Sequence, residues 1–291
     1  MKFGVSPTPH PWWKSVEEFK NWVIEAESCG YAGIFIPDHY NLLVPPFPSN
    51  ELVDVWSTLS YVAAITKNMD IGTCVSPMPR YLPSQLAKII ATVDILSEGR
   101  VIAGLGAGTI PDEFINYSPQ GSFGTPKERV DRFLEGLQII IKLWTEDKVT
   151  FNGKFYRVKD AVLMPKPKQK PRPRLWSGGL GPRMMKITAK YFDAWFPPRV
   201  EIGTPTPEKY SAGVRAIKEY LRKHGREVDK FTFAILGWMT ENITDDIGMI
   251  EKFVQAGCQY YVVEVPWTFP PSDGKYVKLI RKFANEVMPS F

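Results

Sequence analysis

The hydrophobic residues of the chain follow two alternating patterns. Short apolar runs bounded by turn residues, such as Gly33–Pro37 and Tyr260–Val265, have the length and composition of buried strands. Between them, apolar residues recur at the spacing of a helix turn, as in Leu86, Ile89 and Val93. Pro83 at the start of that stretch and Ser97-Glu98-Gly99 after it are typical helix boundaries. The chain therefore alternates predicted strands with predicted helices.

The pattern predicts eight strands, each followed by a helix. The expected strands are Lys2–Ser6, Gly33–Pro37, Asp70–Ser76, Arg100–Gly106, Leu175–Ser177, Asp193–Phe196, Phe231–Leu236 and Tyr260–Val265. Parallel strands need crossover helices, and right-handed crossovers close such a series into a (β/α)8 TIM barrel of the α/β class. We expect one domain over residues 1–291, with insertions after the fourth and sixth strands. An open doubly wound sheet is the alternative, but no GxGxxG follows the first strand.

Two segments depart from this rhythm. Ala107–Thr125 is expected to be a long loop. Val149–Leu163 alternates polar and apolar residues around Asn152-Gly153, which predicts a β-hairpin inserted after the fourth helix.

Composition and charge exclude several classes of protein. Hydrophobic residues make up 44% of the chain, enough for a large core, yet no apolar run is long enough for a membrane span and no signal peptide is evident. The three cysteines are far apart and form no CxxC, which favours a reduced cytoplasmic compartment. The net charge is only +5, without a basic helix face for nucleic acid. The basic run Lys166–Arg174 is either a solvated connector or a counter-charge for an acidic cofactor tail.

The site of a TIM barrel lies at the carboxyl ends of its strands, so the residues there are the candidates. Asp38 and His39 follow the second strand, and an imidazole beside a carboxylate suits acid–base chemistry. The third strand runs into Ser76-Pro77-Met78-Pro79 and then Arg80, a forced turn with a fixed cation that suggests something is held at this tip. His10 is a second candidate for the mouth, whereas His224 is expected at an exposed helix end.

Glycines follow the fourth and fifth strands. Gly104–Thr109 would let the backbone approach a flat ring, and Ser177–Gly181 opens a helix whose free amides suit a phosphate. Trp195, Trp238 and Trp267 are expected at strand tips, with Trp12 and Trp13 at the rim, either as walls for a planar ligand or as a barrel cap. No zinc pattern, Walker loop or GxSxG is present. Glycines, tryptophans and a phosphate site without a metal suggest a phosphorylated planar cofactor that carries the chemistry.

These segments also carry a family resemblance. GYAGIFIPDHY, IGTCVSPMPRYLPSQLAKIIATVDILSEGRVIAGLGAG, ERVDRFLEGLQIIIKLW, VTFNGKFY and MPKPKQKPRPRLWSGG occur in this order. Together they resemble the bacterial-luciferase-like superfamily (luciferase-like monooxygenase domain), and most of all its coenzyme F420-dependent oxidoreductases, such as methylenetetrahydromethanopterin reductase. The resemblance runs almost end to end.

The resemblance implies specific site residues. It implies a bulge in the third strand with a non-prolyl cis peptide at Cys74–Val75, which supports a deazaflavin ring. Catalytic roles are implied for Asp38 and His39, with Glu113 as a possible acid. The expected cofactor-binding residues are Asp38, His39, Thr73, Cys74, Val75, Ser76, Gly106, Ala107, Gly108, Thr109, Ser177, Gly178 and Gly179. No metal is expected.

Two departures from the family pattern bear on the substrate. The sugar-phosphate dehydrogenases of the family carry a tryptophan shortly after the Asp-His pair, where this chain has Tyr40–Leu43. They also carry a catalytic glutamate where this chain has Thr109, with Asp112 and Glu113 further on. Glucose-6-phosphate chemistry is therefore not expected.

Three functions stay open at this point. The first is an F420-dependent oxidoreductase that moves a hydride between the deazaflavin and a small organic substrate. The second is an FMN-dependent monooxygenase of the same superfamily, and the third is a flavin- or deazaflavin-binding protein without turnover. The resemblance also implies a homodimer formed through the second and third helices.

Overall fold

A computed structural model describes residues 1–7, 13, 15–40, 42–44, 47–49, 52–197, 205–240, 242–265 and 274–291. Parallel strands form a closed eight-stranded barrel, as the sequence predicts. The barrel strands are β1 (Lys2–Ser6), β2 (Gly33–Ile36), β5 (Asp70–Thr73), β7 (Val101–Gly106), β10 (Arg174–Ser177), β11 (Ala194–Trp195), β12 (Thr232–Trp238) and β13 (Tyr260–Glu264). Pairing of β10 with β7 completes the ring.

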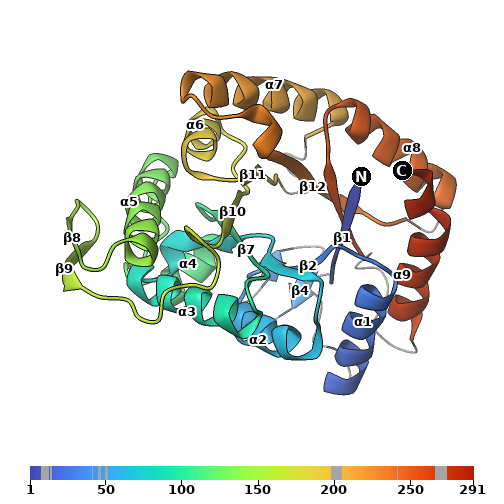
Figure 1. Ribbon diagram of the computed structural model, residues 1–291, viewed down its shortest axis with the longest axis horizontal. Helices are drawn as coiled ribbons and strands as arrows, with labels where there is room; N and C mark the ends of the chain where they lie inside the picture. Colours follow the sequence, from blue (N-terminus) through green and yellow to red (C-terminus); the bar gives the residue numbers. More distant parts are fainter. Residues whose placement is uncertain are drawn as a thin grey trace.

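Helices surround the barrel on the outside (Figure 1). They are α1 (Val16–Ser28), α2 (Val55–Ile65), α3 (Pro83–Leu96), α5 (Pro126–Thr145), α6 (Pro182–Tyr191), α7 (Pro207–Lys223), α8 (Ile243–Gln255) and α9 (Lys275–Glu286). Local sequence explains where they begin. Ser15, Asp54 and Thr125 accept hydrogen bonds from the first turn of α1, α2 and α5 through their side chains. Proline occupies the first position of α3, α5, α6 and α7, where no amide hydrogen is needed.

Several elements differ from the expectation. The third strand is split, because a cis peptide at Cys74–Val75 separates β5 from β6 (Ser76–Pro77), which leads into the 3-10 helix η1 (Met78–Arg80). The expected loop Ala107–Thr125 contains α4 (Pro111–Tyr117). An unforeseen hairpin, β3 (Leu42–Val44) with β4 (Phe47–Ser49), follows β2. The short 3-10 helices η2 (Val228–Lys230) and η3 (Met288–Ser290) complete the described elements.

The inserted hairpin is present, with a longer turn than Asn152-Gly153 predicts. β8 (Val149–Asn152) pairs with β9 (Arg157–Ala161), so residues 153–156 form the connection. Unlike a two-residue turn, this longer connection leaves backbone amide hydrogens without partners in the hairpin. The Glu135 carboxylate on α5 accepts those of residues 154–156. The insertion expected after the sixth strand falls largely on residues 198–204, which lie outside the described residues.

The barrel interior is filled by aromatic side chains. Phe35, Trp176, Phe196 and Tyr260 form its centre, with the Phe35 and Trp176 rings stacked at a centroid distance of 5.0 Å. Glycines make room for them: a Cβ on Gly33 would lie 2.7 Å from the Tyr260 hydroxyl. The interior below the mouth is therefore a packed core without a channel, so any ligand has to bind at an end of the barrel.

A second, larger core lies between the barrel and its helices. Trp13 belongs to it, because its ring packs against Phe19, Trp22 and Tyr276 and is only 8% exposed. The expectation that Trp13 forms part of the rim is therefore wrong. Trp12 lies outside the described residues. Within the described part of the chain, no helix combines the length and apolarity needed to cross a membrane.

Candidate active site at the barrel mouth

A buried arginine connects the tips of β2, β5–β6 and β7. Arg80 has a fully buried side chain and donates to the backbone oxygen of Asp38 (3.2 Å) and to the Glu113 carboxylate (2.9 Å). It also forms an ion pair with the Asp38 carboxylate, which accepts a further hydrogen bond from the Tyr81 hydroxyl at 2.7 Å. The guanidinium lies 3.9 Å from the centre of the Tyr40 ring. The cation that the sequence places after two prolines thus binds two buried carboxylates.

The second oxygen of Glu113 contacts His39. Glu113 Oε1 lies 3.3 Å from His39 Nδ1 and accepts the Tyr40 amide hydrogen at 2.7 Å. Burial by itself raises the pKa of Glu113, but the hydrogen bond from His39 and the Arg80 charge bring that pKa below its ordinary value. An ionised carboxylate only accepts hydrogen bonds, so Nδ1 of His39 carries the hydrogen. The other ring nitrogen, Nε2, is then left to take up or release a proton.

Burial and neighbouring charges shift the pKa values of Asp38 and Arg80 in opposite directions. Burial raises the pKa of Asp38 above its ordinary value, although the Arg80 charge opposes the shift. Burial lowers the pKa of Arg80, but Asp38 and Glu113 more than compensate, so its pKa is raised and the guanidinium stays charged. Among Asp38, Arg80, Glu113 and His39, only His39 has a side chain with substantial exposure, at 28%.

The strand bulge adjoins this network. The Cys74–Val75 peptide is cis, as expected, and both residues are half-buried at the end of the barrel interior. The methyl groups of Val75 lie against two glycines of neighbouring strands. A Cβ on Gly106 of β7 would come within 2.9 Å of Val75 Cγ2, and one on Gly178 after β10 within 2.8 Å. Val75 and the two glycines therefore form a low apolar floor that larger residues would fill.

The glycine loop after β7 is fixed by α4. Gly108 adopts a left-handed backbone conformation with φ of 88°, and a Cβ there would meet the Phe114 ring at 2.3 Å. Ala107 and Gly108 are half-buried beside the mouth, whereas Thr109 is exposed. Glu113 and Phe114 are neighbours on α4, so the helix that holds this loop also supplies the carboxylate for His39.

Three hydroxyl residues of the expected cofactor set are buried. Thr73 Oγ1 donates to the Gly104 carbonyl at 2.7 Å, and this bond ties β5 to β7. Ser76 is fully buried at the start of β6. Ser177 Oγ accepts from Thr188 Oγ1 at 2.7 Å, which anchors α6 to β10. The Thr73 and Ser177 hydroxyl groups thus shape the mouth through the strands and the helix that they join.

Beyond Ser177, the chain offers backbone donors. The loop Gly178–Gly181 leads into α6, which begins without a side-chain cap, so its first amide hydrogens have no partner within the helix. A Cβ placed on Gly181 would meet no atom within 4 Å, so the space beside this helix start is open. Trp195 Nε1 donates to the Gly179 carbonyl at 2.8 Å and fixes the loop from below.

Trp195 does not line the mouth. Its ring is fully buried between the barrel and α7, where it stacks on Tyr210 at 5.1 Å. The expected tryptophan wall is therefore wrong for this residue. Trp238 ends β12 and is half-buried, while Trp267 and His10 lie outside the described residues. His224 caps the end of α7 and is exposed, as expected.

The basic run lies at the opposite end of the barrel. Arg174 pairs with Asp70, each the first residue of its strand. Arg172 pairs with Asp193 just before β11, and Lys168 with Glu98 just before β7. The amino ends of the strands face away from the mouth. The idea that this run neutralises an acidic cofactor tail is therefore wrong, and its charges serve as structural connectors.

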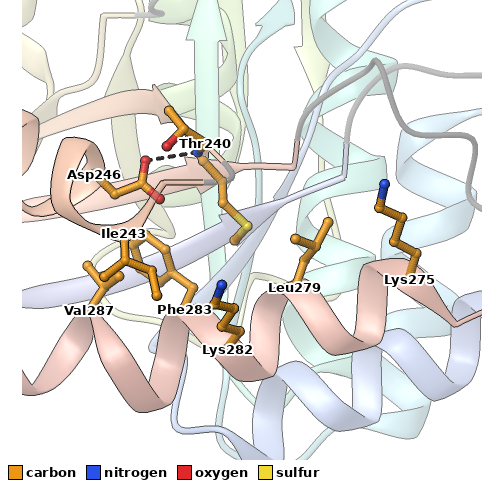
Figure 2. A pocket seen from close by; sticks show the side chains of 9 residues that line it. Thr240, Ile243, Asp246, Lys275, Leu279, Lys282, Phe283 and Val287 are labelled. Carbon is orange, nitrogen blue, oxygen red and sulfur yellow. Dashed lines mark hydrogen bonds between the residues drawn. The ribbon is translucent and has the colours of Figure 1, made fainter.

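Two further hollows lie away from the mouth. One, of about 590 Å³, is at the amino ends of the strands and is lined by Asp70, Arg174 and Tyr260 among others. Another, of about 290 Å³, lies outside the barrel between α8 and α9, where Thr240 donates its amide hydrogen to Asp246 and two lysines, Lys275 and Lys282, lie along α9 (Figure 2). Among the described residues, no group of three metal-ligating side chains occurs.

Three residues of the mouth were not singled out from the sequence. Tyr81 binds Asp38, Ser6 Oγ lies 3.6 Å from Cys74 Sγ, and Glu264 ends β13. A sequence signal existed for Glu264, because it directly follows the apolar run Tyr260–Val263 and shares the side of the strand that Tyr260 and Val262 occupy.

The fold and mouth define a class of protein, a (β/α)8 barrel with a cis-peptide bulge beneath an arginine–carboxylate–histidine network. The sequence model of the luciferase-like monooxygenase family matches residues 1–240. The chain belongs to this family.

Named relatives agree with this assignment. The chain is 30% identical over 206 residues to an F420-dependent hydroxymycolic acid dehydrogenase of Mycobacterium tuberculosis, a match that covers 66% of this chain and 55% of the relative. It is 33% identical over 177 residues to an F420-dependent glucose-6-phosphate dehydrogenase of Kineococcus radiotolerans, covering 60% and 50%. The chain thus spans about half the length of these two curated relatives.

Solved structures share the fold. An F420-dependent secondary alcohol dehydrogenase in complex with an F420-acetone adduct superposes with a TM-score of 0.80 at 19% identity, over 99% of this chain and 98% of that one. The monooxygenase RslO1 from Streptomyces bottropensis gives a TM-score of 0.76 at 19% identity, over 100% and 99%. The F420-dependent tetrahydromethanopterin reductase of Methanopyrus kandleri gives 0.75 at 18%, also over 100% and 99%.

Proposed function

We propose that this protein is a coenzyme F420-dependent oxidoreductase that transfers a hydride between the deazaflavin and a small organic substrate. The observation that carries the proposal is the position of His39: Glu113 fixes its Nδ1 hydrogen, and His39 follows β2 at the same carboxyl end of the barrel as the floor formed by Val75, Gly106 and Gly178. The names of the curated relatives support the choice of cofactor.

The residues of the mouth fit such a cofactor. A flat ring needs a floor without projecting side chains, and the two glycines against Val75 supply one. We assign the ring to this floor and to Cys74, Ala107 and Gly108, with Thr109 at the outer edge of the site. A phosphate would bind the free amides at the start of α6, next to Gly178 and Gly179, whose own amide hydrogens are donated to the Leu105 carbonyl and the Ser177 hydroxyl. Bound there, the deazaflavin would supply two-electron hydride chemistry, for which side chains have no equivalent.

The side chains divide the remaining tasks. His39 takes up or releases the proton that accompanies hydride transfer, because Nε2 is its free ring nitrogen. Glu113 positions His39, and its buried, ionised carboxylate makes a direct acid role unsuitable. Asp38 and Arg80 hold the network, while Thr73 and Ser177 support the strands beneath the cofactor and Ser76 is buried at the start of β6.

Cofactor binding tests the proposal. The apoprotein is titrated with F420 and, separately, with FMN, and binding is followed by the change in cofactor fluorescence. We expect tight binding of F420 and reduction of bound F420 by a secondary alcohol, with weak or no binding of FMN. Tight binding of FMN alone would instead support the second candidate, an FMN-dependent monooxygenase.

That second candidate is supported by the matching family itself and by the similarity to RslO1. A third outcome is also distinct. F420 that binds but is never reduced by an alcohol or a reduced pterin would point to a binding protein without turnover. Exposed Thr109, where the family's sugar-phosphate enzymes carry a glutamate, makes glucose 6-phosphate the substrate least expected to react.

We further propose a homodimer in a reduced, cytoplasmic compartment. α3 and its flanks expose Leu82 and Leu96, at 40% and 58%, on the side that the family resemblance assigns to the partner. The three cysteines are free, consistent with a reducing environment. Light scattering after size exclusion should give twice the mass of the chain, and a monomer mass would contradict the dimer.

A further inference from the structure

A carboxyl group at the end of β13 has no place in the network around Arg80. Glu264 is the last residue of β13, and its backbone pairs with Ser6 of β1 and Trp238 of β12. It is 6% exposed, in the same range as the buried acids Asp38 and Glu113, each at 1%. The network used for His39 therefore leaves one buried carboxyl at the mouth without an assigned task.

Strand geometry shows where Glu264 points. Side chains alternate along a strand, and Tyr260 and Val262 of β13 belong to the aromatic interior of the barrel. Glu264 lies two residues after Val262, so its side chain points to the same side of β13, one step closer to the carboxyl end. Its side chain therefore lies in the top layer of the barrel interior, at the base of the mouth.

The alternation of side chains along β1 and β5 places Ser6 and Cys74 in the same layer. Gly4 of β1 and Gly72 of β5 face the interior, since a Cβ on either would meet the Phe35 ring. Ser6 and Cys74, two residues further along, contact each other at 3.6 Å between Oγ and Sγ. Glu264 is the register partner of Ser6 between β13 and β1, so its side chain lies beside the contact of Ser6 with Cys74.

The Glu264 carboxyl lacks a compensating partner. The side chains of Asp38 and Glu113 each bind Arg80, whereas Glu264 forms no hydrogen bond or ion pair within the part of the chain that the structure describes. Burial raises its pKa from an ordinary 4.5 to about 8. The Cys74 thiol, whose own pKa is raised by burial and by Glu264, remains neutral beside it. At neutral pH the carboxyl therefore keeps its proton and is a hydrogen-bond donor.

The donor lies on the side of the mouth away from the cofactor floor. Val75 leans towards Gly106 and Gly178, at the ends of β7 and β10. Glu264 is the last residue of β13. Around the barrel, β11 and β12 lie between β10 and β13, and β1, β2 and β5 lie between β13 and β7. A ring on the floor with its phosphate at α6 leaves the end of β13 to the substrate.

We propose that Glu264, in its neutral form, donates a hydrogen bond to the oxygen of an uncharged carbonyl or alcohol substrate. This inference rests on the proposed function and adds the class of substrate. The carboxyl keeps its proton throughout, so it positions the oxygen while His39 handles the proton. A phosphate or carboxylate on the substrate would face this acid without a compensating cation from the described residues, so charged substrates are disfavoured.

The first test uses the apoprotein. Infrared spectra of the wild type and Glu264→Gln are compared across pH. We expect a protonated-carboxyl band in the wild type near pH 7 that disappears as pH rises through about 8 and is absent from Glu264→Gln. Loss of that band already near pH 5 would show an ordinary ionised carboxylate and overturn the inference.

Thermal stability gives an independent reading of the same group. Below about 4.5 the carboxyl is protonated in both folded and unfolded chains and contributes no pH dependence. Between about 4.5 and 8 the folded protein binds more protons than the unfolded chain, so stability falls as pH rises. Glu264→Gln should therefore raise the melting temperature near pH 9 and leave it unchanged near pH 4. Glu251→Gln, on the exposed side of α8, is the control.

Kinetics test the contact with substrate. For a neutral secondary alcohol, wild-type kcat/KM should fall as pH rises through about 8, and Glu264→Gln, which still donates, should remove this fall. Glu264→Ala should lower kcat/KM by about 10- to 100-fold, with F420 affinity within twofold of the wild type. An unaffected Glu264→Ala enzyme would overturn the inference, as would a Glu264→Gln enzyme inactive at every pH.

The two proposals fail differently. A wild type that binds neither F420 nor FMN overturns the proposed function and, with it, the substrate contact. In that case the infrared band still shows whether Glu264 is neutral. A wild type that binds and turns over F420, but whose Glu264→Ala variant is unchanged, overturns the inference alone.

Discussion

At the scale of single residues, the site depends on which charges are paired. Arg80 binds Asp38 and Glu113 inside the protein, where an unpaired charge would be costly. Glu113 in turn fixes the tautomer of His39, a relation between residues 74 positions apart in the chain. Only the folded structure shows this, because nothing in the spacing of α4 singles out Glu113 over its neighbour Asp112.

Glu113→Gln tests this arrangement. Every group around the Glu113 carboxylate donates a hydrogen bond, so the amide NH2 of glutamine must face a donor in either orientation. We expect kcat to fall by about 10- to 100-fold because His39 is no longer positioned. Nitrogen-15 NMR should show His39 changing from the Nδ1–H tautomer to a mixture.

Asp112→Asn is the matched control, since Asp112 is the exposed neighbour of Glu113 on α4 and should leave both readouts unchanged. An unaltered tautomer in Glu113→Gln, together with unaltered kcat, would show that Glu113 does not position His39.

At the scale of elements, the bulge between β5 and β6 determines the shape of the mouth. The sequence predicted a strand there, and the break at Pro77 and Pro79 indicated a forced turn. The cis peptide at Cys74–Val75 was expected from the family resemblance alone, since no local pattern of the chain predicts it. What the bulge does became visible only with β7 and β10 in place, because Val75 packs on glycines that those strands supply.

Gly178→Ala tests the floor. The added methyl group would come within 2.8 Å of Val75 Cγ2, and the β-branched side chain can move little. We expect F420 affinity to fall at least about tenfold, measured by fluorescence titration, with a stability loss of about 1–3 kcal/mol from overpacking. Val75→Ala in the same protein should restore part of the affinity, because it removes the methyl groups that clash.

Gly248→Ala in α8 is the control for a glycine-to-alanine change. A Cβ there meets no atom within 4 Å, so affinity should not change. Full affinity in Gly178→Ala would mean that the ring does not bind on this floor.

At the scale of the whole molecule, the two ends of the barrel have different tasks. The carboxyl ends carry the buried arginine–carboxylate network, the histidine and the glycines. The amino ends carry Arg174 with Asp70 and Arg172 with Asp193, which connect strands. From its charge alone, the basic run Lys166–Arg174 was a candidate for cofactor binding. The structure places it at the amino ends of the strands, away from the mouth.

Lys168→Glu combined with Lys170→Glu tests this separation of the two ends. Both side chains are exposed at the amino end, so F420 affinity at low ionic strength should stay within about twofold of the wild type. Arg183→Glu, on the first turn of α6 beside the glycine loop, should weaken binding and serves as the positive control. Equal weakening by both changes would indicate that the acidic tail reaches the amino end.

Predictability differs between the elements and the site. The alternation of apolar runs and amphipathic stretches predicted the eight barrel strands and their helices, because that periodicity directly reflects burial on two faces. α4 and the β3–β4 hairpin were missed, since both are short. α4 is held by contacts of Glu113 with Arg80 and of Phe114 with Gly108, which no local pattern indicates. Asp38 and His39 were found because the barrel rule points to residues at strand ends.

The sequence by itself determined the (β/α)8 barrel, the end of it that bears chemistry and the family, because backbone periodicity and turn residues are local properties. The tertiary structure decided which charges are paired. It pairs Arg80 with Asp38 and Glu113 and places Trp195 and the lysines away from the mouth. Among the described residues, it leaves the Glu264 carboxyl buried without a partner. Such assignments depend on distances between residues far apart in the chain, and only the closed barrel sets those distances.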